Sequence, residues 1–204
     1  MGTRGLYCVI HKAKTVVAQY GQWDANPEGN GVTLFNFLKS VNLDWFKEKL
    51  EQVKFVNKTK QKEIDKWLKS IGSIDGWLTT EQSKLYQNKY PYITRDLGGK
   101  IMELILCAPA DEIIWVQDSI EFAADSLFCE WAYVIDLDKG NFEVYEGYNH
   151  KTLSKPQRFK YMEEVGKDYT PVKCIKKFKI SKLSKLTEEE FLALVNAKAT
   201  KDEE

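Results

Sequence analysis

Two short runs near the start of the chain are rich in β-branched and aromatic residues and predict a β-hairpin. The first run is Gly5–His11, the second covers 15–23, and the three residues between them form the connection. With a two-residue turn, the numbers of paired residues sum to about 25. Thr3 is therefore expected opposite Gln22, which brings the first residues of the chain close to Asp24.

Helical spacing dominates the middle of the chain. Apolar residues recur at three- and four-residue steps over 32–38, 43–53 and 60–71, which predicts three helices. Residues 100–107 are apolar nearly all round and predict a buried helix that ends before Pro109.

A second hairpin and a last strand follow. Alternating runs over 130–138 and 141–147 flank a turn that contains Gly140, which is a strong hairpin signal. Residues 172–180 also alternate and predict a strand. Thr187 and the three acidic residues after it predict the start of a final helix.

Strands at both ends of the chain, with helices between them, predict an α+β fold. We expect one mainly antiparallel sheet, built from the N- and C-terminal strands and covered by helices from the middle of the chain. A single domain over 1–197 is expected, with 25–89 as a candidate helical subdomain and 198–204 as a flexible tail.

The composition indicates a folded chain and excludes some partners. Of the 204 residues, 43% are apolar and 13% aromatic, which suffices for a sizeable core. Lys plus Arg (30) balance Asp plus Glu (30), whereas nucleic-acid binders usually carry a basic excess, so the sequence argues against a nucleic-acid partner. No apolar run is long enough to span a membrane, and no apolar leader follows Met1. We therefore expect no membrane partner and a cytoplasmic location.

Cysteine and histidine usage gives no sign of a metal or cofactor site. Only His11 and His150 offer imidazole ligands, and no phosphate-binding or dinucleotide-binding motif is present. The cysteines lie far apart in apolar contexts, which is typical of buried free thiols: Cys8, Cys107, Cys129 and Cys174. We expect no metal and no cofactor.

Two short segments carry charges that allow two interpretations each. Asp136 and Asp138 lie on one face of a strand and could bind a cation; alternatively, Asp138 starts the turn and Asp136 is solvated. Arg95 and Asp96 precede two glycines and a helix, which could form an anion site. Alternatively, Asp96 caps the helix and Arg95 pairs with an acidic residue.

The remaining candidate is a binding site at the N-terminal hairpin. There the expected register gathers an Arg, an Asp, a Gln and the exposed N–H groups of a Gly-rich loop. The candidate binding residues are Thr3, Arg4, Tyr20, Gln22, Trp23, Asp24, Gly29 and Gly31. The alternative is a structural corner, in which Asp24 satisfies loop N–H groups and Trp23 covers the core.

These same residues carry a resemblance. The chain resembles an uncharacterised protein family found in bacteriophages and bacteria. The resemblance lies in the opening Thr3-Arg4-Gly5 and in the loop Gln22-Trp23-Asp24 with Pro27, Gly29 and Gly31. Residues 129–138 and 142–145 resemble the same family. The family has no established activity, and the resemblance implies a phage or prophage origin and the cytoplasm of a bacterial host.

Two functions from different classes follow. The first is a phage-type accessory protein that binds a host or defence component, either a protein or a small ligand. The second is a small hydrolase, because a short N-terminal strand beside an Asp-containing loop is similar to the start of N-terminal nucleophile hydrolases. The sequence departs from that pattern, since Gly2 follows Met1 and Thr3 becomes terminal only if Gly2 is also lost. The sequence decides neither between the two classes nor on the oligomeric state.

Overall fold

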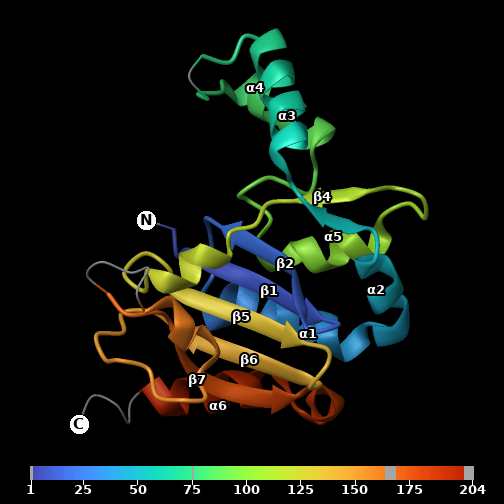
Figure 1. The fold of residues 1–204 in the computed structure, drawn as a ribbon. Coiled ribbons are helices and arrows are strands. Elements are labelled where there is room, and N and C mark those ends of the chain that lie inside the picture. The colour runs from blue at the N-terminus through green and yellow to red at the C-terminus, as the bar shows by residue number, and fades with distance from the viewer. Residues whose placement is uncertain (1, 75, 164–168, 200–204) are drawn as a thin grey trace.

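A five-stranded sheet organises the computed structural model, which describes residues 2–74, 76–163 and 169–199. The strands lie in the order β2-β1-β5-β6-β7, and all neighbours are antiparallel except β1 and β5 (Figure 1). Their bounds are β1 Gly5–His11, β2 Lys14–Gly21, β5 Trp131–Asp136, β6 Asn141–Glu146 and β7 Lys173–Lys179. The predicted α+β fold, with a sheet built from both ends of the chain, is confirmed.

The first hairpin contains a bulge that changes the expected register. Partner numbers sum to 25 at the turn, where His11 faces Lys14, but to 26 from Val9 and Val17 onward. Gly5 consequently faces Gly21. The predicted pairing of Thr3 with Gln22 was wrong, because the bulge shifts the register by one residue. Thr3 still lies beside the Asp24 segment, because its carbonyl accepts a hydrogen bond from the Ala25 N–H (3.1 Å).

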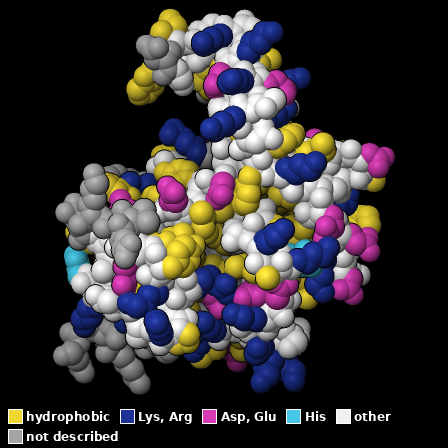
Figure 2. All heavy atoms as spheres, in the orientation of Figure 1, with side chains coloured by type: hydrophobic (Ala, Val, Ile, Leu, Met, Phe, Trp, Pro, Cys, Tyr) yellow, Lys and Arg dark blue, Asp and Glu magenta, His cyan; other side chains and the backbone are white. Residues whose placement is uncertain are grey.

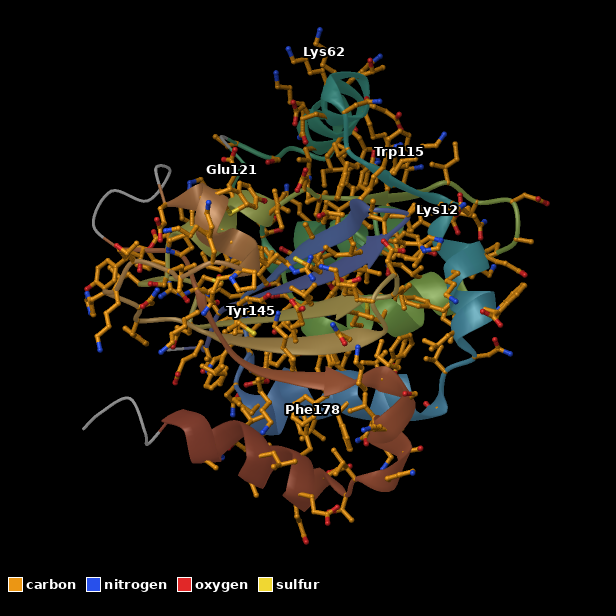
Figure 3. All side chains as sticks on the ribbon, turned by 60° about the horizontal axis from the view of Figure 1, so that its bottom comes forward. Lys12, Lys62, Trp115, Glu121, Tyr145 and Phe178 are labelled. Carbon is orange, nitrogen blue, oxygen red and sulfur yellow. The ribbon has the colours of Figure 1, made fainter. Side chains whose placement is uncertain are left out.

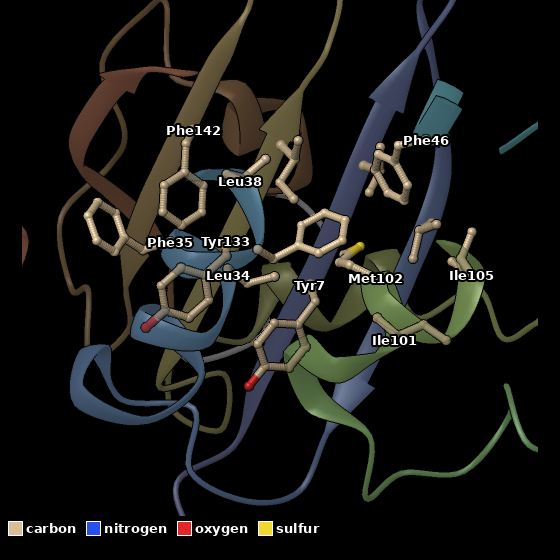
Figure 4. Packing of buried hydrophobic residues seen from close by; sticks show 14 of the residues in the cluster. Tyr7, Leu34, Phe35, Leu38, Phe46, Ile101, Met102, Ile105, Tyr133 and Phe142 are labelled. Atoms are coloured by element: carbon tan, nitrogen blue, oxygen red, sulfur yellow. The ribbon is translucent and has the colours of Figure 1, made fainter. Parts of the chain in front are cut away.

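Helices cover one face of the sheet and enclose the larger core. Tyr7, Tyr133 and Phe142 stack in a row on neighbouring strands and pack against Leu34 and Phe35 (Figure 4). The covering elements are η1 Pro27–Gly31, α1 Val32–Ser40, α2 Leu43–Leu50, η2 Gly98–Lys100, α5 Ile101–Cys107, η5 Ile180–Lys185 and α6 Glu188–Ala199.

The other face is covered by two 3₁₀ segments and holds a buried ionic cluster. These segments are η3, Ile120–Ala124, and η4, Arg158–Met162. Arg158 donates to Asp136 (2.5 Å) and to Glu143 (2.9 Å), and both acidic residues are 1% exposed. The Tyr145 hydroxyl, labelled in Figure 3, also donates to Glu143 (2.5 Å).

The carboxylate pair of the second hairpin therefore has two structural roles. Asp136 is buried and paired rather than solvated, which corrects the sequence-based interpretation. Asp138 accepts the N–H groups of Lys12 (2.9 Å) and Ala13 (2.7 Å), two residues with positive φ in the first hairpin turn. The second hairpin turn thus stabilises the first through Asp138.

A helical arm projects from the body (Figure 1). It consists of α3, Lys58–Ser70, and α4, Thr80–Lys89, above a small parallel pair formed by β3, Val53–Phe55, and β4, Ile114–Val116. Its core is small and separate: Ile64, Tyr90 and Ile93 are buried there, with Trp67 and Tyr86 packed around them. Figure 3 shows Lys62 at the outer end of the arm and Trp115 near its base.

The four cysteines differ in exposure. Cys8 and Cys129 are buried, but Cys107 is exposed and Cys174 is half-buried, so the prediction of four buried thiols was wrong. No helix within the described residues combines the length and the apolar character needed to cross a bilayer. The domain division stays a prediction, and residues 200–204 of the expected tail lie outside the described residues.

Candidate functional site

One buried side chain, Asn30, holds the loop that follows the first hairpin. Its Nδ2 donates to the carbonyls of Trp23 (2.9 Å) and Asp24 (2.8 Å), and its Oδ1 accepts the Gly99 N–H (2.6 Å). Asp24 adopts a positive φ of 53°. The loop and the start of η2 are therefore joined by a single amide.

The loop glycines leave no room for a ligand. A Cβ on Gly29 would lie 2.4 Å from the Asp24 carbonyl oxygen, and one on Gly31 would lie 3.0 Å from the Tyr133 hydroxyl. The N–H groups of residues 29–31 donate to the carbonyls of Asp24 and Asn26. Asp24, Gly29 and Gly31 thus form a packed corner, in which Asp24 accepts through its main chain.

Three of the other predicted residues reach the surface. The Tyr20 hydroxyl donates to Gln22 Oε1 (2.6 Å), and the Gln22 N–H donates to the Arg95 carbonyl (2.9 Å). Trp23 is 48% exposed, and its Nε1 donates to Asp96 (3.0 Å). These contacts run from the hairpin toward the base of the arm.

Arg4 lies on the same side of the molecule. Its guanidinium sits 3.7 Å from Glu130 and 4.7 Å from the centre of the Phe128 ring. Burial raises the pKa of Tyr20, and the positive charges of Arg4 and Arg95 partly oppose that rise. The Tyr20 hydroxyl is therefore influenced by the positive charge of both arginines.

A cavity of about 720 Å³ separates the arm from this surface, and we call it the arm cleft. Figure 2 shows a hollow between the outer end of the arm, where apolar side chains gather, and the body. Its lining includes apolar or aromatic side chains and two charged ones: Trp77, Leu78, Tyr86, Ile93, Arg95 and Asp96.

Asp96 connects the arm cleft to the predicted residues. One carboxylate oxygen accepts Trp23 Nε1 (3.0 Å) and the other accepts Gln87 Nε2 of α4 (3.3 Å). Asp96 therefore does not cap the following helix. Arg95 has no acidic partner among the described residues, which corrects the other half of that interpretation.

Sequence reasoning missed the cleft residues Trp77 and Tyr86. The pair Gly76-Trp77 signals a turn, but a sequence does not show that a turn residue is 83% exposed beside a cavity. Asn30 belongs to the predicted Gly-rich loop, but the sequence did not show that its side chain holds the corner.

The described residues contain no convincing catalytic pair. His11 lies near Glu51 (3.4 Å) and Asp138 (3.8 Å), and His150 lies against Tyr169; neither has a Ser, Thr or Cys side chain as a hydrogen-bond partner there. Burial raises the pKa of the Cys8 and Cys129 thiols well above the ordinary value. Such thiols are poor nucleophiles.

Comparison with known proteins gives no relative from which a function could be inferred. No protein-family model, no curated protein and no solved structure matches the chain. The molecule is thus defined by its own features: an α+β body, a projecting two-helix arm and the arm cleft between them.

Proposed function

We propose that the chain is a phage-type accessory protein that binds a host or defence component in the bacterial cytoplasm, and that the arm is its binding element. One observation carries this proposal. Ile74 and Trp77, at the tip of the arm, are 74% and 83% exposed. Exposed Trp side chains beside a concavity are frequent anchors of protein interfaces.

Helix α4 of the arm is poorly covered in the part of the chain that the structure describes. α4 contains no buried residue, and Leu85 on it is 51% exposed. Stable domains are usually built from at least two packed layers that share a core. A segment of a partner laid against α4 and the tip would supply the missing layer.

The charge of the arm favours an acidic protein as that partner. Helix α3 carries four exposed lysines, spaced three or four residues apart along it: Lys58, Lys62, Lys66 and Lys69. None of them has an ion-pair partner within the described part of the chain. Such charges at an interface accelerate association at low salt more than they raise affinity.

The hydrolase alternative gains no support from the geometry. The Thr3 carbonyl is part of the corner, and Gly2 packs so closely that a Cβ there would lie 1.9 Å from the Trp23 ring. The binding function is therefore the one that the structure supports best.

Affinity capture from a lysate of the bacterial host tests the proposal. We expect the wild-type chain to retain a stoichiometric acidic protein, and the double variant Ile74→Ser/Trp77→Ala to lose it. Trp45→Ala is the matched control, because Trp45 is a comparably large side chain on α2, 47% exposed and away from the arm. Absence of any stoichiometric partner, or equal capture by the double variant, would contradict the proposal.

A further inference from the structure

The arm cleft has the size and lining of a small-molecule site. Its volume of about 720 Å³ lies within the range of about 300–1,000 Å³ that is usual for such sites. Trp77, Tyr86 and Ile93 form its apolar walls. Such a site takes its specificity from the few polar groups that face the cavity.

Two charged side chains line the cleft, and only Arg95 lacks a side-chain partner among the described residues. Each oxygen of Asp96 accepts one hydrogen bond, from Trp23 Nε1 and from Gln87 Nε2. The Arg95 guanidinium lines the cleft and has no hydrogen bond or ion pair with any side chain that the structure describes. The cleft is therefore suited to an anion, and an arginine fork binds carboxylate or phosphate through two parallel hydrogen bonds.

The aromatic walls are held in place. Tyr86 packs against Trp67 and Tyr90, with ring centres 6.4 and 5.6 Å away. The Trp77 N–H donates to the Ile74 carbonyl (2.9 Å), and its own carbonyl accepts the Ser73 hydroxyl (3.2 Å). These two hydrogen bonds hold the turn that carries the exposed Trp77 indole, whose flat face is open to stacking.

We propose that the arm cleft binds a small ligand made of a flat aromatic ring and one anionic group, with the ring against Trp77 and Tyr86 and the anion on Arg95. A mononucleotide and an aromatic carboxylic acid share this chemistry. The inference rests on the proposed binding function of the arm and specifies a small-ligand component for it.

Calorimetric titration of the full chain at low ionic strength tests the inference with two pairs of probes. Adenosine 5′-monophosphate is compared with adenosine, and indole-3-acetate with indole-3-acetamide. We expect at least one anionic probe to bind at a single site, about tenfold or more tightly than its neutral counterpart. The pair that responds identifies phosphate or carboxylate as the anion.

Variants assign the binding to the cleft. Arg95→Ala should lower the affinity of the anionic probe to that of the neutral one, and Trp77→Ala should weaken both probes of the pair. The fold should tolerate Arg95→Ala, because the Gln22 N–H bonds to the main-chain carbonyl of that residue. Lys14→Ala, an exposed substitution on β2, is the control and should change nothing.

Three results would overturn the inference: no binding of either anionic probe at millimolar concentration, an affinity unchanged in Arg95→Ala, or binding only of a single-stranded oligonucleotide. If any of these results is found but the wild-type chain still captures a partner, the proposed function stands. If the wild-type chain captures no partner but binds a ligand in a manner that depends on Arg95, only the protein-binding proposal is overturned.

Discussion

Asn30 is the residue on which the N-terminal corner depends. Its side chain bonds three backbone groups from two separate segments, and it is 9% exposed. We expect Asn30→Ala to lower the free energy of unfolding by about 2–4 kcal/mol, because buried polar groups lose their partners. Urea unfolding measures the change. Asn88→Ala on exposed α4 should be neutral, and equal stability of the two variants would refute the role given to Asn30.

Glu143 is the centre of the buried ionic cluster. Burial alone would raise the pKa of Glu143. Hydrogen bonds from Arg158 and Tyr145 lower the pKa by more than burial raises it, so it lies below the ordinary 4.5. A depressed folded pKa contributes stability that is complete above the unfolded value and is lost as the pH falls through the folded value. The wild-type chain should therefore lose stability in acid, below about pH 4.5.

The substitution Glu143→Gln isolates this contribution. It leaves the half-buried Arg158 with one acidic partner fewer, and we expect a loss of about 3–5 kcal/mol at neutral pH. The remaining loss of stability in acid should then be shallower than in the wild type. Thermal melting between pH 3 and 7 measures both effects, with Glu48→Gln on α2 as the control. Parallel pH profiles of wild type and Glu143→Gln would contradict the assignment.

The sequence predicted correctly that Thr3 and Asp24 lie close together, but it did not predict the burial of Asp136 or the exposure of Cys107. The hairpin pattern was enough to bring Thr3 and Asp24 together, because strand pairing is local there. Asp136 was expected in solvent, but its partner Arg158 comes from a later segment that no local pattern connects with it. Cys107 was expected inside, but it lies at the end of α5, where the helix reaches the surface.

At the level of elements, the arm should be the least stable part of the body-and-arm assembly. α4 buries no side chain, whereas β5 is buried along almost its whole length. Local opening requires little free energy where few apolar contacts are lost. We expect amide hydrogens of α4 to exchange with deuterium at least about tenfold faster than those of β5. Mass spectrometry of the exchanged peptides measures this, and equal protection of the two elements would show that the arm is packed in solution.

Element boundaries in the middle of the chain show where periodicity stops being informative. The pattern predicted a helix over 43–53, but α2 ends at Leu50 and β3 begins at Val53. Val53 pairs with Ile114, about sixty residues away, and a helical pattern does not reveal such a partner. Helices α1 and α2 cover the sheet, whereas α3 and α4 form the arm.

For the whole molecule, balanced charge is the dominant electrostatic property. The formal net charge is zero at pH 7 and the sequence pI is about 6.8. Proteins with no net charge repel one another least, so solubility should be lowest near this pH. Precipitation by polyethylene glycol between pH 5 and 9 measures the minimum. Lys62→Glu/Lys66→Glu should move it to lower pH, and a minimum that does not move would show that charge is not the cause.

The parallel pairing of β1 with β5 has a consequence for biosynthesis. Gly5 pairs with Trp131 and Ile10 with Asp136, so every contact of this pair joins residues 126 positions apart. At about 5–20 residues per second, a ribosome takes about 6–25 s to add the missing strand. The first hairpin therefore waits in the nascent chain with the β1 hydrogen-bonding edge bare, and the centre of the sheet closes only after most of the polypeptide has been made.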